Sequence, residues 1–196
     1  MKQTQTDWEA TYQRGDTPWE KGKAHPALID FLAENGPVPG DILVPGCGFG
    51  YDVRTLSTSA NHVIGIDLAQ FAIVRAKSFP KVGSEEYLLV DLFTLPAVFD
   101  SKFDIVFEHT CFCAIEPATR VKYMETIARV LKSGGKVIAI FFLNPDHDEN
   151  GPPYGVLRSE LDELFGAQFS LEKEWVPRRT YEGREQRELM RILCRL

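Results

Sequence analysis

One stretch decides the fold, Leu43-Val44-Pro45-Gly46-Cys47-Gly48-Phe49-Gly50. An apolar run enters a turn with glycine at alternate positions, and a second apolar run, Val63-Ile64-Gly65-Ile66, ends at Asp67. This order of strand, glycine turn, helix and strand-terminal acid is typical of an α/β sheet that holds a ribose-bearing cofactor. Asp67 follows Gly46 by 21 positions, a spacing that suits a carboxylate on ribose hydroxyls. The pattern predicts that Gly46, Gly48 and Asp67 bind a nucleoside cofactor.

The spacing of the glycines narrows the choice of cofactor. Dinucleotide sites use Gly-x-Gly-x-x-Gly, whereas here the third glycine comes one residue early, in Gly46-x-Gly48-x-Gly50. A tight turn also favours glycine for conformational reasons alone. The chain has no Gly-x-x-x-x-Gly-Lys-Ser/Thr run that would cradle a triphosphate. The shorter spacing resembles the first motif of Rossmann-like methyltransferases that use S-adenosylmethionine, and an NAD-dependent oxidoreductase remains as an alternative.

Length and composition favour one small-molecule enzyme domain. With 196 residues, 44% of them hydrophobic, we expect a single domain over residues 1–196. The net charge of −6 argues against nucleic acid as a substrate. No apolar run is long enough for a membrane span, and the polar start does not resemble a signal peptide. We therefore expect a monomeric, cytoplasmic protein that acts on a small molecule or anion.

The four cysteines predict neither a disulfide framework nor a metal site. The run His109-Thr-Cys111-Phe-Cys113 would place three potential ligands on one face of a strand, without a fourth ligand nearby. We therefore expect that the protein holds no metal.

Hydrophobic periodicity predicts alternating strands and helices. Strands are expected at 41–44, 62–66, 86–90, 103–107, 135–142, 169–176 and 188–195, and helices at 7–14, 27–34, 50–57, 69–78, 117–131 and 157–165. Alternation of this kind predicts a Rossmann-like, doubly wound sheet of seven mostly parallel strands. The last two strands are separated by a polar stretch whose length suits an antiparallel hairpin.

The carboxyl ends of the parallel strands bring the candidate site residues to one rim. In chain order these residues are Gly46, Asp67, Asp91, the pair Glu108-His109 and Phe142. Asp91 suits the exocyclic amine of adenine, with Leu92 covering the ring, although an acid after a strand can also be an N-cap. The long loop 144–155 follows the fifth strand, where loops are often functional.

Four segments carry a resemblance to a known family. They are Trp8-Glu-Ala-Thr-Tyr-Gln-Arg-Gly-Asp-Thr-Pro-Trp-Glu-Lys-Gly22, Val44-Pro-Gly-Cys-Gly48, Phe112-Cys-Ala-Ile-Glu-Pro117 and Gly151-Pro-Pro-Tyr154. Together they resemble the thiopurine S-methyltransferase superfamily, and within it the thiol and halide ion methyltransferases. The resemblance covers nearly the whole chain from Trp8 onward.

The resemblance implies S-adenosyl-L-methionine as cofactor, S-adenosyl-L-homocysteine as its product, and a set of site residues. Residues 1–36 would form a helical lid in which Trp8, Tyr12 and Trp19 cover the cofactor, and aromatic ring faces suit a sulfonium cation. Cofactor contacts would also come from Gly46, Gly48, Asp67, Leu68, Asp91, Leu92, Glu108 and His109. Phe142, Arg120 and Tyr154 would lie near the methyl acceptor. The alternative for Phe142 is a buried strand aromatic, and the alternative for Arg120 is a solvated charge on a helix face.

The expected activity is methyl transfer to a small soft nucleophile such as bisulfide, thiocyanate, a halide or a small thiol. An acceptor that is already an anion needs no general base, so alignment and desolvation would carry the catalysis. Methylation of a thiopurine or other aromatic thiol, or of a selenium or tellurium species, is the alternative within the same family. A non-enzymatic cofactor-binding regulator is a further alternative.

Overall fold

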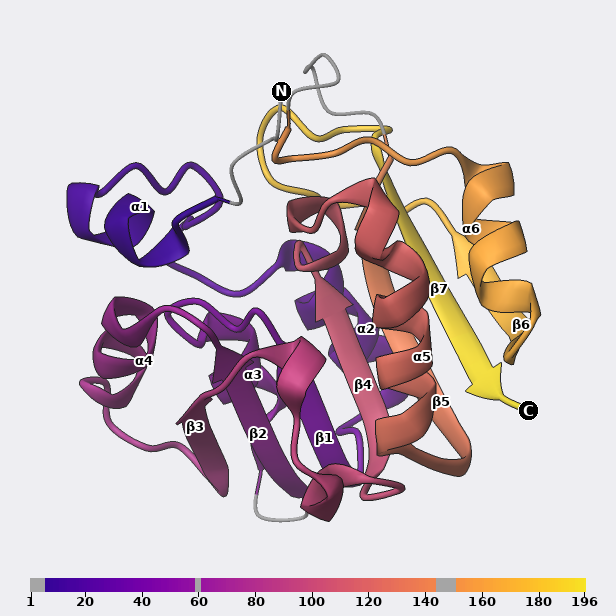
Figure 1. Cartoon of the computed structure of the whole chain (residues 1–196), viewed down its shortest axis with the longest axis horizontal. Coiled ribbons are helices and arrows are strands. Elements are labelled where there is room, and N and C mark those ends of the chain that lie inside the picture. Colours follow the sequence, from indigo (N-terminus) through magenta and orange to yellow (C-terminus); the bar gives the residue numbers. More distant parts are fainter. Residues whose placement is uncertain (1–5, 59–60, 144–150) are drawn as a thin grey trace.

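Seven strands form one sheet in the order β3-β2-β1-β4-β5-β7-β6 (Figure 1). This computed structural model describes residues 6–58, 61–143 and 151–196. The strands are β1 (Gly40–Pro45), β2 (Asn61–Asp67), β3 (Glu85–Leu89), β4 (Phe103–His109), β5 (Leu131–Phe142), β6 (Phe169–Trp175) and β7 (Glu188–Arg195). Neighbours among β1 to β5 are parallel, while β7 runs antiparallel to both β5 and β6. The predicted sheet with its antiparallel C-terminal hairpin is confirmed.

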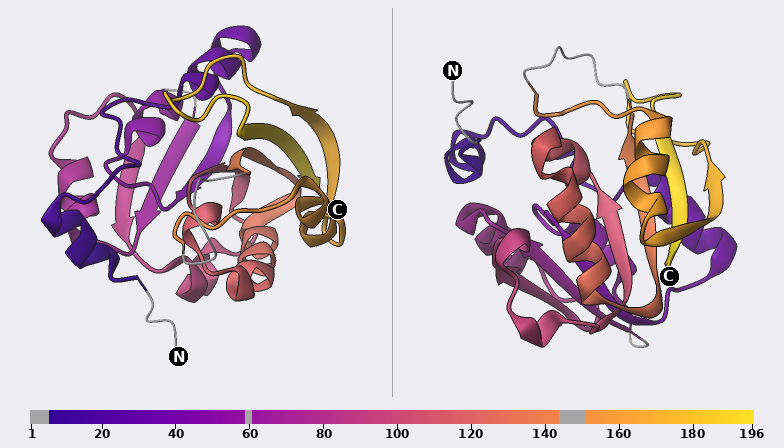
Figure 2. Two further views of the ribbon diagram at one scale, coloured as in Figure 1. Left: turned by 90° about the horizontal axis from the view of Figure 1, so that it is seen from above. Right: turned by 45° about the vertical axis from the view of Figure 1, so that its right-hand side comes forward.

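Helices cover both faces of this sheet (Figure 2). They are α1 (Trp8–Arg14), α2 (Pro26–Asn35), α3 (Tyr51–Leu56), α4 (Gln70–Lys77), α5 (Arg120–Val130) and α6 (Arg158–Gly166). Apolar side chains of α5 and α6 pack on one face, and those of α2, α3 and α4 pack on the other. α1 lies apart from the sheet and packs beside α4 (Figure 1). None of the helices described is long and apolar enough to cross a membrane.

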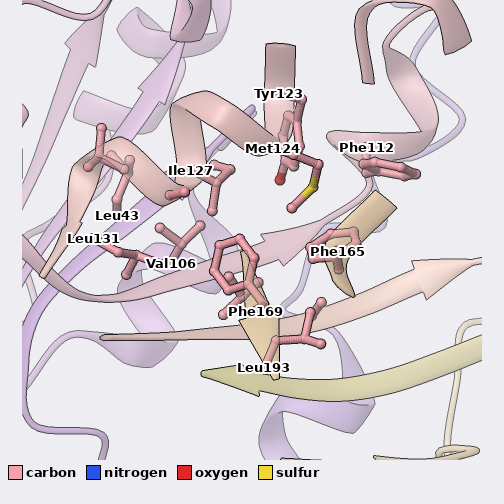
Figure 3. Close-up of a cluster of buried hydrophobic side chains, with 14 of the residues drawn as sticks. Leu43, Val106, Phe112, Tyr123, Met124, Ile127, Leu131, Phe165, Phe169 and Leu193 are labelled. Atoms are coloured by element: carbon pink, nitrogen blue, oxygen red, sulfur yellow. The ribbon is translucent and has the colours of Figure 1, made fainter. Parts of the chain in front are cut away.

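Alternation along β1 divides the core between the two faces. Leu43 packs with α5 in one cluster, whereas Ile42 and Val44 pack with α2 and α3 in the other. Figure 3 shows the first cluster, in which Tyr123 and Ile127 of α5 face the sheet. Because both faces are covered, the central strands are nearly continuous apolar runs, as is typical of parallel strands.

The differences from the expected elements lie at boundaries and in short turns. The expected helix 117–131 begins as a 3-10 turn, Pro117–Thr119, and α5 proper starts at Arg120. Two more 3-10 turns, Leu92–Thr94 and Phe112–Ala114, follow β3 and β4 directly. Turns of three residues are too short to show a hydrophobic period, so the sequence pattern could not reveal them.

The glycine turn brings β1 into α3 through a left-handed backbone. Gly50 precedes α3 with φ of +73°, and a Cβ added there would lie 2.5 Å from the Tyr87 ring. A side chain at this position would be strained and would also clash. The third glycine of the motif therefore has a packing role.

Candidate functional site

A cleft of about 630 Å³ opens at the carboxyl ends of the strands, beside the N-terminal segment. Residues after β1, β2, β3 and β5 all line it, as expected for a doubly wound sheet. Of the residues expected from the sequence, the cleft is lined by Trp8, Tyr12, Trp19, Gly46, Asp67, Leu68, Asp91, Leu92 and Phe142. The structure thus brings together residues that lie up to 134 positions apart, from Trp8 to Phe142.

Asp67 holds the glycine turn and lines the cleft at the same time. Its Oδ2 accepts the Gly48 N–H at 3.0 Å, and its Oδ1 accepts the Ala69 N–H at 2.9 Å. Burial raises the pKa of this carboxyl, and the backbone N–H groups oppose that shift. An ionised carboxylate has about four acceptor positions. The acceptor positions that the backbone leaves open can receive hydroxyl groups of a ligand, so the carboxylate suits a ribose.

Asp91 is the N-cap of a short turn and also lines the cleft. Its Oδ1 accepts the Phe93 N–H at 2.8 Å and so caps the short turn Leu92–Thr94. The same residue lines the cleft beside Leu92 and Phe93. An apolar side chain next to a carboxylate suits a purine ring that offers an amine at its edge.

Three aromatic rings of the N-terminal segment pack together at the cleft. The ring centroids of Trp8 and Trp19 lie 5.4 Å apart, and those of Tyr12 and Trp19 lie 5.7 Å apart, both edge to face. Trp19 Nε1–H also donates to the Tyr12 hydroxyl at 3.2 Å. Leu68, which also lines the cleft, is 48% exposed. The rings form an electron-rich wall that suits a cation.

A second, smaller cavity of about 40 Å³ adjoins the cleft on the other side of the glycine turn. Gly46, Gly48, Glu20, Asp52 and His109 are among its lining residues. His109 Nδ1 lies 2.7 Å from Asp52 Oδ2. Although burial opposes ionisation of Asp52, His109 holds the pKa of that carboxyl below its usual range. Thus His109 lies at this smaller cavity, and it does not line the larger cleft.

Near the smaller cavity, His25, His109 and Glu188 offer three potential ligand atoms within 4.8 Å of one another. The His25 ring limits what this group can do. Its Nδ1 accepts the Ala27 N–H at 3.1 Å, so in the neutral ring the proton is on Nε2, which lies 2.8 Å from Glu188 Oε2. A protonated Nε2 offers no lone pair, so this tautomer does not suit a metal.

Glu108 and Tyr154, both expected at the site, line neither cavity. Glu108 is 1% exposed and accepts the Phe112 N–H at 2.7 Å and the Tyr123 hydroxyl. Through the Tyr123 hydroxyl, Glu108 therefore links α5 to the end of β4. Tyr154 is buried, and its N–H donates to the Cys113 carbonyl at 2.6 Å. Residues 144–150 of the loop expected to be functional lie outside the described residues.

Arg120 does not lie at the cleft, and it is not a solvated charge either. Its side chain is 2% exposed and pairs with Glu160 Oε1 at 2.8 Å. It also donates to the Gly155 carbonyl at 2.9 Å, and its guanidinium lies 4.8 Å from the Phe112 ring centroid. The first turn of α5 points this side chain at α6, so Arg120 joins these two helices to the chain after β5.

Replacing Arg120 by methionine should lower the free energy of unfolding by about 2–3 kcal/mol, because a buried charge network loses its centre. Cofactor affinity should change little. Urea unfolding and cofactor titration measure the two quantities. The matched control is Arg158→Met, which removes an arginine that is 62% exposed and should change stability far less. A loss of turnover at unchanged stability would instead indicate that Arg120 acts at the acceptor site.

The structure adds residues that the sequence reasoning did not place at the site. Arg184, from the loop between β6 and β7, lies with its guanidinium 4.6 Å from the Phe142 ring centroid. It lines the cleft together with Cys111 and Cys113. Burial raises the pKa of the Cys111 thiol, and that of Cys113 to about 12, so both stay neutral. Arg178, Arg179, Arg184 and Arg187 lie close together in the sequence, but no local pattern links Arg184 to Phe142.

Comparison with known proteins agrees with this geometry. The profile of the thiopurine S-methyltransferase (TPMT) family matches residues 3–188. The probable thiol methyltransferase 2 of Arabidopsis thaliana is 39% identical over 163 residues, which cover 81% of this chain and 70% of that protein. Thiocyanate methyltransferase 1 of Brassica oleracea is 33% identical, with the same coverage of both chains.

Solved structures share the fold at lower identity. A 1,6-didemethyltoxoflavin-N1-methyltransferase from Burkholderia thailandensis, solved with S-adenosylhomocysteine bound, superposes with a TM-score of 0.72 at 19% identity. The match covers 95% of this chain and 84% of that one. The fold is thus the one used by S-adenosylmethionine-dependent methyltransferases. With the family profile matching nearly the whole chain, this protein belongs to the thiopurine S-methyltransferase family.

Proposed function

We propose that this protein transfers a methyl group from S-adenosylmethionine to a small soft anion, such as bisulfide, thiocyanate or a halide, or to a small thiol. The observation that carries the proposal is Arg184, a cation stacked on Phe142 inside the cleft that Asp67 also lines. The guanidinium offers an attractive potential to an anion, and the Phe142 ring offers a polarizable apolar wall. The names of the relatives, thiol and thiocyanate methyltransferases, support the same acceptor class.

The residues of the cleft fit the cofactor in two parts. Asp67 and Asp91, with Leu92, suit the ribose and the adenine, while Trp8, Tyr12 and Trp19 suit the sulfonium. The volume of about 630 Å³ lies within the range of small-molecule sites. Bound there, the cofactor supplies an electrophilic methyl group on a positively charged sulfur. Residues 6–21 line the cleft and act as the lid that excludes water, whereas α2, which was expected to belong to this lid, packs on a face of the sheet.

The chain's own residues then have three tasks. The aromatic wall of Trp8 and Trp19 keeps water away from the reacting centre, which strengthens every electrostatic contact inside. Arg184 draws the anion to the Phe142 side of the cleft and holds it in line. Because an anionic acceptor brings its own electron pair, no residue needs to remove a proton. Cys111 and Cys113, kept as neutral thiols, do not compete as nucleophiles.

An acceptor panel tests the proposal. Turnover with iodide, thiocyanate, hydrosulfide and a neutral alkyl thiol should be compared by kcat/KM, with volatile methyl products measured by gas chromatography. We expect the anions to exceed the neutral thiol. Failure of every acceptor, with cofactor binding intact by calorimetry, would favour a cofactor-binding regulator.

The size of the cleft favours a second candidate, a bulkier aromatic thiol. A volume of about 630 Å³ leaves room for a ring beside Phe142 and Ile115 once a cofactor is bound. The panel should therefore include an aromatic thiol and selenite. A kcat/KM for the aromatic thiol above that for every small anion would select this alternative. The monomeric state, the cytoplasmic location and the absence of a nucleic-acid partner stay predictions.

A further inference from the structure

Glu20 lies directly on the glycine turn, in the smaller cavity. Its Oε1 accepts the Phe49 N–H at 3.1 Å. A Cβ added to Gly48 would lie only 2.5 Å from that same oxygen, so the glycine is what allows the carboxylate to approach. No role in the ribose, adenine or acceptor sites uses this residue. Its carboxylate is a buried acid held against the first motif of the fold.

The surroundings of Glu20 disfavour a negative charge. Burial raises its pKa to about 7, and the carboxylates of Asp52 and Asp67 act in the same direction, while the Phe49 N–H and His109 oppose them. The other titratable groups around the carboxyl or along the cavity wall are Lys21 and Lys23 of the N-terminal segment, Tyr12 of α1, Cys47 of the glycine turn, Tyr51 of α3 and Tyr181 of the loop before β7. Near neutral pH this carboxyl is therefore part protonated.

The smaller cavity continues the cleft across the glycine turn. Trp19, Gly46 and Thr110 line both spaces. A ligand whose nucleoside lies at Asp67 and Asp91 would reach past Gly46 into the smaller cavity with its opposite end. In S-adenosylmethionine that end is an amino acid, which carries an ammonium group and a carboxylate. The ammonium group suits the buried carboxyl of Glu20, and Lys21, which lines both spaces, suits the carboxylate.

We propose that Glu20 receives the α-ammonium group of the cofactor in the smaller cavity and that cofactor binding drives a proton off this carboxyl into solvent. The proposal rests on the proposed use of S-adenosylmethionine. It assigns a recognition residue for the amino-acid end of the cofactor. It also makes the affinity for the cofactor depend on pH.

The direction of the pH effect on cofactor affinity follows from the positive charge of the ammonium group. A cation beside Glu20 stabilises the ionised form, so the pKa is lower in the complex than in the free protein, and binding strengthens as pH rises through about 7. At pH 7 binding should release about half a proton, approaching about one at pH 6 and none above about pH 8.5. Below pH 7 the dissociation constant should rise by up to about tenfold per pH unit.

Titration calorimetry in two buffers of different ionisation enthalpy counts the released protons directly. The probes are S-adenosylhomocysteine and 5′-methylthioadenosine, which share the nucleoside thioether, while only the first has an amino-acid end. Wild-type protein should release the proton with S-adenosylhomocysteine and none with 5′-methylthioadenosine. In Glu20→Gln, whose amide oxygen can still accept the Phe49 N–H, the release should vanish and the pH dependence should flatten.

Glu9→Gln is the matched control, because Glu9 also belongs to the N-terminal segment and accepts a backbone N–H, that of Phe71 at 2.9 Å, outside both cavities. It should release the proton as wild type does. Equal release from both probes, or undiminished release from Glu20→Gln, would assign the proton to another group and overturn the proposal. If Glu20→Gln does not fold, the contrast between the two probes on wild type decides alone. If neither probe binds, the proposed function itself fails.

Discussion

Asp67→Asn should weaken S-adenosylhomocysteine binding by about 100-fold, the largest loss we expect from a single isosteric change in this protein. Both carboxylate oxygens already accept backbone N–H groups, from Gly48 at 3.0 Å and from Ala69 at 2.9 Å. An asparagine would turn an amide NH₂ toward one of them and repel it. The change therefore disturbs the glycine turn and removes a charged acceptor for the ribose, at about 1.5 kcal/mol for each of two hydrogen bonds.

Calorimetric titration with S-adenosylhomocysteine measures this loss, and thermal unfolding without ligand checks the fold. The matched control is Asp41→Asn at the opposite end of the sheet, where the side chain is 37% exposed. It should leave the dissociation constant unchanged. A dissociation constant for Asp67→Asn within about threefold of wild type would show that the ribose is held elsewhere.

Arg184→Gln should lower kcat/KM for thiocyanate or iodide by about 100-fold while cofactor affinity stays near that of wild type. The side chain is 13% exposed, so the field of its guanidinium is only partly screened by water. Glu188 Oε1 lies 3.2 Å away and would be left to repel an anion. The substitution thus removes an attraction and uncovers a repulsion.

Comparing neutral with anionic acceptors tests whether Arg184 acts through its charge. A neutral alkyl thiol should lose much less activity than an anion, because its attraction to the guanidinium is weaker. Arg178→Gln, at an exposed position of the same loop, serves as the matched control and should leave the activity unchanged. An equal loss for neutral and anionic acceptors would mean that Arg184 only supports the shape of the loop between β6 and β7.

Most of the fold was predictable, because its signals are local. Strict apolar runs such as Ile42 to Val44 and Val63 to Ile66 mark strands buried on both faces, and alternation with amphipathic helices fixes their parallel direction. The glycine turn and Asp67 follow the same logic, since strand ends gather at one edge. The structure accordingly brings Gly46, Asp67, Asp91 and Phe142 to one cleft.

The positions of the charged side chains could not be predicted from the sequence. Arg120, expected at the mouth of the acceptor site, is buried against Glu160, because the first turn of α5 points it toward α6. Arg184, 42 positions after Phe142 in the chain, lies on that ring because the loop between β6 and β7 returns over the end of β5. A charge acquires its role from partners that are distant in sequence. No periodicity encodes such partners.

Local sequence patterns were enough to predict the layered sheet, the edge at which a cofactor is expected and the aromatic character of the N-terminal segment. These features depend on backbone conformation and hydrophobic burial, which short stretches of residues specify locally. The partners of the ionisable groups became known only from the folded chain. Glu20 accepts an N–H of the glycine turn, His109 pairs with Asp52, and Arg184 lies over the Phe142 ring. The physical reason is that electrostatic roles depend on distance and desolvation, and both are set only when the whole chain has packed.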